Sequence, residues 1–400
     1  MTNKTNKIAL YILMFNLFIT MGGVGIVVPV LPLYLEQFNA GGTIIGALTA
    51  GFAFAQFLIS PIAGDLSDRY GRKPFIVGGL IIYSVSMLLF GLSTELWMLF
   101  AARFLSGIGA AFIMPPIMAY VADITTVEER GKGMGFIGAS ISLGFTIGPG
   151  IGGILSKVSL PFPFYFAAIA AFIAAIVSVT LLPKVKAAAT DPTASPKKRP
   201  NLFVQLVAST KKAYFVFLIV VFTFSFGVAN LQSTLAIYLT NKFSYSPLDI
   251  SMILTIGGII GVVLQIYVVD KLFKAVGELK VIIINLIVAG VTTFLVIFFS
   301  KYFIILLVTV IFSISTTFIR PAVNTLISKV AGPEQGYAAG MNTAYMSLGN
   351  MFGPLLAGIL YDWHAESPYI LGFIILLICS IITFIWAKSK VPHLLHNRSA

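Results

Sequence analysis

The sequence predicts an all-α polytopic membrane protein, built from twelve transmembrane helices in two pseudosymmetric six-helix bundles. Of its 400 residues 58% are hydrophobic and only 10% are charged, whereas soluble domains average about 25% charged residues. Apolar runs of about 18 residues or more, long enough to cross a hydrocarbon core of about 30 Å, recur along the whole chain. An internal repeat between the two halves predicts that the helices form two related bundles.

The apolar runs define the predicted spans in order. The first run is interpreted as a retained span, because it is too long for a signal-peptide core and no small-residue cleavage pattern follows it. The twelve spans are expected at about residues 8–35, 43–63, 75–93, 96–122, 133–156, 162–182, 213–239, 249–268, 281–299, 302–328, 337–361 and 369–387. The predicted domain boundaries are 1–183 for the N-terminal bundle, 184–212 for a cytoplasmic linker, 213–388 for the C-terminal bundle and 389–400 for a cytoplasmic tail.

The net charge of +12 favours a membrane topology over nucleic-acid binding, because the basic residues lie in alternate loops. With the N-terminus inside, the loops on the opposite side hold only Lys157, Lys242 and Lys301. This asymmetry predicts a protein of the cell membrane with both termini in the cytoplasm. The linker segment PKVKAAATDPTASPKKRPN is expected to be a solvated topogenic loop, with binding of anionic lipid headgroups as the alternative.

The two halves align without a gap at an offset of 205 residues. Gly131–Leu155 and Gly336–Leu360 share an SLG triplet, a Gly-Pro pair and a GIL triplet, and Pro116 falls on Pro321. Such a repeat is typical of secondary transporters, in which the substrate site lies at the midplane between the repeats. It predicts a pseudo-two-fold axis along the membrane normal and a cavity between the bundles.

Two motifs stand out from the apolar background. The fifth span contains GFTIGPGIGGIL, where small residues allow close helix contacts that membrane helices need. The loop between spans two and three reads GDLSDRYGRKP, with acidic residues able to cap helix ends and basic residues that hold the loop inside. The predicted gating and coupling residues are Asp65, Asp68, Arg69, Arg72, Asp123, Gly144, Gly148, Pro149, Gly152 and Gly153.

Both motifs resemble signatures of the major facilitator superfamily. The glycines follow the G-x8-G-x3-G-P-x2-G-G pattern of proton-driven exporters, and the loop resembles the G-x-L-x-D-R-x-G-R-K gate latch. With GVGIVVPVLP, FAFAQFLISP and RFLSGIGAAFIMPP in spans one, two and four, the chain resembles the twelve-span drug:proton antiporters that export quinolones and dyes. The resemblance implies the major facilitator fold and efflux of amphiphilic drugs by proton antiport. Generic close packing and a purely topogenic loop are the alternatives.

The resemblance also suggests a substrate cavity, with one departure. The exporters carry an acid in span seven where this chain has Gln232, and another where it has Thr317, so neither position holds a proton here. Asp123, at the end of span four, is the best remaining carboxylate, although an ion pair with the Arg72 loop is the favoured interpretation. The predicted cavity residues are Gln56, Arg103, Ser142, Asn230, Gln232, Thr317, Arg320, Phe18, Phe145 and Tyr345.

Two arginines remain at depth without an obvious partner. An ionisable residue inside a bilayer costs several kcal/mol, so Arg103 and Arg320 are expected to be functional, with a bond to backbone carbonyls as the alternative. A positively charged cavity should disfavour dicationic drugs and favour neutral, zwitterionic or anionic amphiphiles. If transport is coupled to protons, we expect Asp123 to carry the protons and Arg103 to sense the change in the charge of Asp123.

The sequence lacks the motifs that are typical of other function classes. No catalytic, metal-binding or nucleotide-binding motif is present, and the single cysteine, Cys379, cannot form an internal disulfide. The sequence therefore predicts no enzyme, cofactor, metal or nucleic-acid partner, and a channel is disfavoured. The expected partners are the lipid bilayer, amphiphilic small molecules and protons, and the protein is expected to be monomeric. The alternative to drug efflux is export or flipping of an endogenous amphiphile, such as a glycolipid, or of an anionic metabolite, and uptake ranks third.

Overall fold

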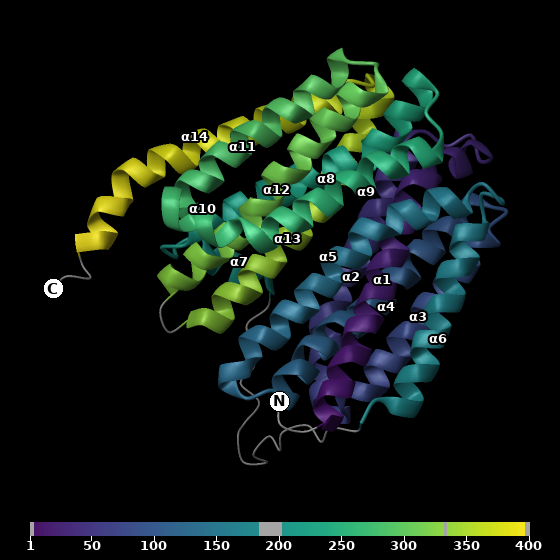
Figure 1. Cartoon of the computed structure of the whole chain (residues 1–400), viewed down its shortest axis with the longest axis horizontal. Helices are drawn as coiled ribbons and strands as arrows, with labels where there is room; N and C mark the ends of the chain where they lie inside the picture. Colours follow the sequence, from purple (N-terminus) through teal and green to yellow (C-terminus); the bar gives the residue numbers. More distant parts are fainter. Residues whose placement is uncertain (1–3, 184–201, 332–333, 397–400) are drawn as a thin grey trace. The chain divides into compact units, whose positions relative to one another are not determined.

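The computed structural model describes residues 4–183, 202–331 and 334–396 of the chain (Figure 1). Over these ranges the chain folds into helices joined by short connections, and it contains no strand. It divides into two compact units. One comprises Met1–Lys197 and Ala236–Thr255, and the other comprises Lys198–Leu235 and Ile256–Ala400.

The first unit contains α1 (Lys4–Glu36), α2 (Gly42–Tyr70), α3 (Arg72–Gly91), α4 (Leu96–Ile124), α5 (Val127–Leu155) and α6 (Phe162–Leu181). These helices run side by side in Figure 1. Helix α1 packs mainly against α5 and also against α6, while α3 packs against both α4 and α6. A buried aromatic cluster of Tyr34, Phe90 and Phe164 holds α1, α3 and α6 together, with ring centroids 4.7 to 5.9 Å apart.

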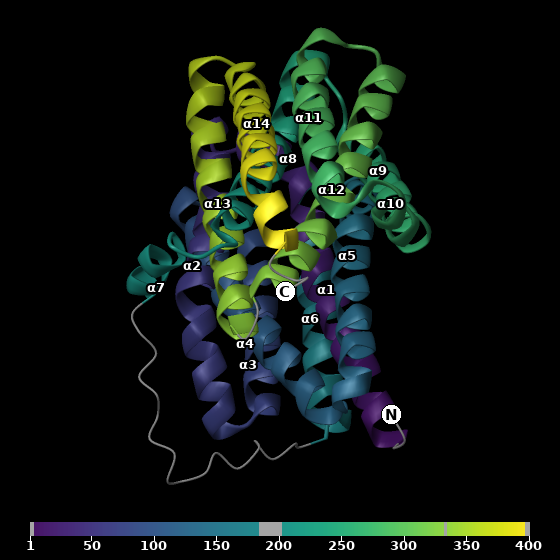
Figure 2. The same cartoon turned by 90° about the vertical axis from the view of Figure 1, so that its left-hand side faces the viewer.

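The rest of the chain forms α7 (Leu202–Ser209), α8 (Phe215–Phe243), α9 (Pro247–Tyr267), α10 (Val269–Val276), α11 (Glu278–Leu295), a 3₁₀ turn (Val296–Phe298), α12 (Tyr302–Ala331), α13 (Gln335–Trp363) and α14 (Ser367–His396). The units divide within α8 and α9. In the second unit α11 packs against α12 and α14, and α13 lies beside α14 (Figure 2). The sequence places 184–212 in a linker, and its last part forms the short helix α7, which packs against α13.

The all-α fold and the twelve predicted long helices are confirmed. Within the described ranges, eleven helices are long and apolar enough to cross a membrane. The remaining predicted span, at 337–361, lies in the 29-residue helix α13. Polar side chains such as Asn342, Ser347 and Asn350 lower its hydropathy.

The glycines of the fifth span explain why a helix of weak helix formers is retained. A Cβ added at Gly148 would lie 2.5 Å from the carbonyl oxygen of Gly22 on α1. Gly144 and Gly152 lie one helical turn before and after Gly148. A Cβ added at either of them would also lie 2.5 Å from a carbonyl oxygen of α1. The glycines therefore seat α5 directly on the backbone of α1, the kind of close contact that stabilises helix pairs in membranes.

The second half repeats this contact. On α13, a Cβ at Gly353 would lie 2.6 Å from the carbonyl oxygen of Phe226 on α8, and one at Gly349 would lie 2.5 Å from the α8 carbonyl one turn earlier. These glycines match Gly148 and Gly144 at the predicted offset. The internal repeat is thus a repeat of packing as well as of sequence.

Candidate functional site

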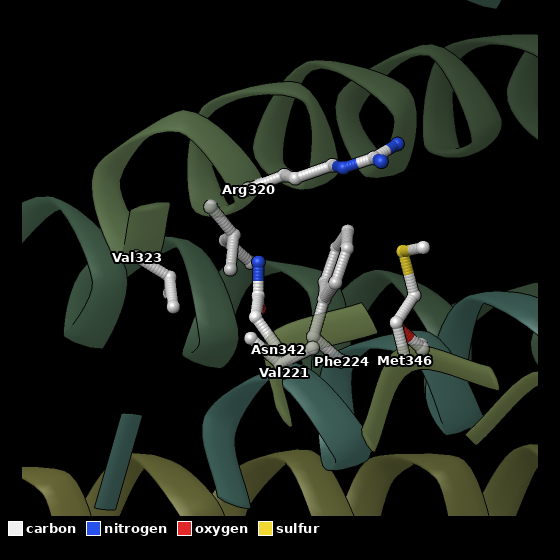
Figure 3. A pocket seen from close by; sticks show the side chains of 8 residues that line it. Val221, Phe224, Arg320, Val323, Asn342 and Met346 are labelled. Atoms are coloured by element: carbon white, nitrogen blue, oxygen red, sulfur yellow. The ribbon is translucent and has the colours of Figure 1, made fainter. Parts of the chain in front are cut away.

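A small pocket in the second unit lies where α8, α12 and α13 meet, and its cavity volume is about 10 Å³, room for about one water molecule. In Figure 3 the side chain of Arg320 extends from α12 over Phe224 toward Met346. None of the described side chains that line the pocket is acidic. Arg320 is an exposed residue beside a mostly apolar pocket wall, and no carboxylate of the described residues neutralises it there.

Asn342 adds a second polar group to this pocket. Its Nδ2 atom donates a hydrogen bond of 2.9 Å to Oδ1 of Asn324. Its own Oδ1 atom is buried and has no hydrogen-bond partner among the described residues. Arg320 can donate to an anionic or acceptor group, and the Asn342 oxygen can accept from a ligand. Phe224 and Met346 supply an aromatic and a polarisable surface for an apolar body.

The other predicted cavity residues of the second half have different surroundings. Thr317 lies against α9, where a Cβ added at Gly261 would come 2.6 Å from its Oγ1 atom. Asn230 is 1% exposed, and its Nδ2 atom donates 3.1 Å to the carbonyl oxygen of Pro368. Tyr345 shares a hydrogen bond of 3.0 Å with Ser209 of α7. Gln232 is half-buried on α8.

Arg103 occupies an aromatic site in the first unit. It is 5% exposed, and its guanidinium carbon lies 5.2 Å from the centroid of the Phe90 ring. Among the described residues, its buried Nε atom has no hydrogen-bond partner, and therefore no backbone carbonyl accepts a hydrogen bond from this atom. A cation–π contact is worth about 2 kcal/mol when it is desolvated. The Tyr34–Phe90–Phe164 cluster therefore holds this cation.

The remaining predicted cavity residues of the first half are dispersed over three helices. Gln56 donates from Nε2 to the Met114 sulfur at 3.4 Å. Phe18 lines a crevice formed by α1, α5 and α6, together with Phe166. Ser142 and Phe145 are half-buried on α5. Within the first unit these side chains do not line one common pocket.

The loop motif forms an ion-pair network around Arg72, the first residue of α3. Its Nε atom lies 3.2 Å from Oδ2 of Asp123 at the end of α4. The same guanidinium pairs with Asp68 and donates 3.0 Å to Oγ of Ser67. Asp65 and Arg69 of the motif are exposed on α2. This network joins the ends of α2, α3 and α4, and it contains the ion pair that the sequence favours for Asp123.

Gly153 differs from the glycines that face α1. A Cβ added there would meet Ser251 Oγ, and the carbonyl oxygen of Pro247 would lie 2.9 Å away. Both of these residues lie at the start of α9, in the segment that belongs to the first unit. Pro149 is buried, and its Cδ atom lies 2.8 Å from the position of a Cβ at Gly25. The predicted gating residues of α5 thus occupy two faces of this helix.

Sequence analysis missed Asn342, Asn324 and Met346 as neighbours of Arg320. A signal for the first of these was available, since an asparagine inside a predicted span must find a polar partner. It also missed Gly22, which the repeated spacing of glycines in the first span could have indicated.

Comparison with known proteins now decides the family. The profile of the Major Facilitator Superfamily matches residues 13–274 and 217–400. The chain belongs to the major facilitator superfamily. Multidrug resistance protein 1 of Bacillus subtilis (strain 168) is 40% identical over 388 residues, covering 96% of this chain and 97% of that protein. Multidrug resistance protein 2 of the same strain is 38% identical over 385 residues and covers 96% of each chain.

Two further comparisons agree with the superfamily assignment. The Quinolone resistance protein NorA of Staphylococcus aureus (strain COL) is 37% identical over 359 residues, covering 90% of this chain and 91% of that protein. A bacterial homologue of the human lysosomal transporter Spinster shares the fold with a TM-score of 0.77 at 15% identity, covering 98% of this chain and 99% of that chain. The protein is therefore a multi-pass membrane transporter of the major facilitator superfamily and not an enzyme.

The Arg72 network yields a prediction about the transport cycle. Asp68→Asn is expected to slow transport about tenfold while equilibrium substrate binding changes less than about twofold, since the network biases conformers and Asp68 lies outside the Arg320 pocket. Transport rate and equilibrium binding should be measured on the same purified variant, with Glu36→Gln, an exposed carboxylate outside the predicted gating residues, as the control. A parallel loss of both quantities would assign Asp68 a structural role.

Proposed function

We propose that this transporter exports amphiphilic drugs by alternating access, in exchange for protons. The observation that carries the proposal is similarity over almost the whole chain to two proteins named for multidrug resistance, at 38% and 40% identity. The close α1–α5 and α8–α13 packing supports it, because alternating access moves such helix pairs as rigid elements. We further propose that both termini are cytoplasmic and that the protein acts as a monomer.

The chemistry of the Arg320 pocket supports a substrate class. Arg320 lies among apolar side chains, and no acidic side chain belongs to the pocket wall among the described residues. A carboxylate on the substrate would complete this site, whereas a dication would be repelled. The proposed substrates are neutral, zwitterionic or anionic amphiphiles whose apolar body lies on Phe224 and Met346.

A second candidate is export or flipping of an endogenous amphiphile, such as a glycolipid, or of an anionic metabolite, with weak or absent proton coupling. The observation that favours it is the chemistry of Gln232 and Thr317, which cannot titrate at the two positions where the drug:proton exporters carry acids. This candidate shares the Arg320 pocket and differs in substrate and energy source.

Equilibrium binding to the purified protein tests the substrate class. Three probes should be compared: a monocarboxylate drug with an aromatic body, a neutral drug of similar size, and a dicationic dye. Arg320→Gln is expected to weaken carboxylate binding about tenfold or more, the effect of losing a charge-assisted hydrogen bond. The affinity for the neutral drug should change less than about twofold.

Arg69→Gln provides the matched control, because it removes an arginine that is exposed outside this pocket. Equal loss of the neutral and carboxylate probes in Arg320→Gln would contradict a charge-selective pocket. Tight binding of the dicationic dye by the parent protein would also contradict the proposed substrate class.

A further inference from the structure

The second half contains a counterpart of the Arg72–Asp123 ion pair in which both charges are reversed, Glu278 with Lys329. The structure locates it through two glycines, Gly71 with φ +94° and Gly277 with φ +85°. Each precedes the first residue of a helix, α3 or α11, and among the described glycines these two have positive φ. This left-handed conformation is costly for other residues, so the two turns are equivalent, and here the offset between halves is 206.

At this offset four ionic residues correspond with opposite sign, whereas Arg69 and Lys73 fall on the uncharged Ala275 and Leu279. Asp65 falls on Lys271, Asp68 on Lys274, Arg72 on Glu278, and Asp123 on Lys329. The four residues occupy the same places in both halves. Two lie on the helix that ends before the glycine, and the third is the first residue of the helix that follows the glycine. The fourth lies near the end of the next long helix, α4 or α12.

The central ion pair is present in both halves. In the first half Arg72 Nε lies 3.2 Å from Asp123 Oδ2, and in the second Lys329 Nζ lies 2.5 Å from Glu278 Oε1. Each pair joins the start of one helix to the end of the next, α3 to α4 and α11 to α12. The Glu278 side chain is 19% exposed and the Lys329 side chain is 51% exposed, so the pair is shielded from water only on the glutamate side.

Reversal of sign changes how each pair interacts with the helix dipoles. Glu278 lies in the first turn of α11 and Lys329 in the last turn of α12, where an anion and a cation are respectively favoured. Arg72 and Asp123 lie at the corresponding helix ends with the disfavoured signs. The first-half charges therefore depend on each other and on Asp68, whereas the helix ends themselves stabilise each charge of the second pair.

We propose that Glu278 and Lys329 form a permanent clamp between the ends of α11 and α12, the charge-reversed counterpart of the exchangeable Arg72 network. Both are positioning residues: they keep the second half rigid at this end while the first-half network changes partners during the cycle.

Spin labels on Ile284→Cys of α11 and Ser328→Cys of α12, both exposed positions, test the clamp without any substrate. Cys379 is replaced by alanine in this background so that only the introduced cysteines react. In the reconstituted parent protein the distance distribution between labels should be single and narrow. Glu278→Gln should broaden it, and Glu278→Lys, which places a second cation against Lys329, should broaden it further.

The decisive variant reverses all signs at once. Lys274→Asp/Glu278→Arg/Lys329→Asp reproduces the signs of the first half at equivalent positions, and it should restore a narrow distribution. Substrate transport should fall about two- to fivefold in Glu278→Gln, as expected for a partly exposed ion pair, and recover at least halfway in the triple variant. Lys280→Gln, an exposed change on α11, is the control and should behave as the parent.

The proposal would be overturned if the distance distribution between the labels were no narrower in the triple variant than in Glu278→Lys. An unchanged distribution in Glu278→Gln would overturn it as well. The distance measurement needs no substrate, so failure of the clamp and failure of the drug-export proposal give different results.

Discussion

Gly148→Leu is expected to abolish transport while the protein still inserts into the membrane at close to normal yield. The position of a Cβ at Gly148 is 2.5 Å from the carbonyl oxygen of Gly22 and 3.0 Å from the Cα atom of Gly25. These are backbone atoms of α1, so no side-chain rotation can relieve the overlap. A leucine must push α5 away from α1, and overpacking of this kind costs about 1–3 kcal/mol or more. Gly152→Leu should behave alike, because Gly152 meets the Ile26 carbonyl oxygen at 2.5 Å.

The same helix provides matched controls. Gly135 and Gly138 also lie on α5, and a Cβ at either position has no atom of a neighbouring element within 4 Å. Gly148→Ala should reduce the transport rate at least about tenfold, whereas Gly135→Ala and Gly138→Ala should leave it within about twofold. Membrane yield and melting temperature should be measured for all variants. Full transport by Gly148→Leu would show that the glycine contact serves only static packing.

Much of the fold could be predicted because the strongest signals are local or repeated. Length and hydropathy located each long helix, since crossing a bilayer demands a long apolar run. Gly148 and Gly353 indicated equivalent helix contacts because packing backbone on backbone tolerates only small residues. The short helix α7 was not predicted, because its eight residues are too few for a periodic pattern.

The orientation of side chains within the helices was much harder to predict. A helix that is apolar on all sides has no polar face to indicate its neighbours. Thr317 was therefore assigned to the cavity from the family pattern, with no means to foresee its contact with Gly261 on α9. Tyr345 is predicted for the cavity because aromatic side chains suit adaptable binding of apolar ligands, and its hydrogen bond to Ser209 depends on α7, which the sequence did not reveal.

The charge-reversed clamp escaped sequence analysis for a different reason. The repeat was aligned at an offset of 205, which fits Gly148 and Gly353, whereas Gly71 and Gly277 require 206. A search for identical residues also rejects a pair such as Arg72 and Glu278. What the two halves share at this end is a backbone turn and an ion pair, and only coordinates display both.

Proton coupling is expected to be weak in the parent protein and stronger in Gln232→Glu. Antiport requires a group that titrates near the working pH and is exposed alternately to each side, and burial raises the pKa of a carboxylate toward that range. Gln232 is half-buried on α8, so a glutamate there would be partly desolvated. The measurement is transport driven by a pH jump in proteoliposomes. Gln232→Asn, a neutral polar change at the same position, is the matched control and is expected to gain no coupling.

Any coupling in the parent is expected to pass through Asp123, the predicted boundary acid. Asp123→Asn should remove it, but this change also breaks the ion pair with Arg72. Arg72→Gln separates the two effects, because it breaks the same pair and keeps the carboxylate. Arg103 and Asp123 are separated by twenty residues of α4, about 30 Å of helix, so we expect Arg103 to sense Asp123 through movement of α4 and not through direct contact.

The three variants then give distinct outcomes. Coupling that is lost in Asp123→Asn and retained in Arg72→Gln supports Asp123 as the proton carrier. Strong coupling that survives Asp123→Asn would exclude that assignment. No coupling in the parent together with a gain in Gln232→Glu would favour export of an endogenous amphiphile or anionic metabolite, because the chain would then lack only the titrating group that drug:proton exchange requires.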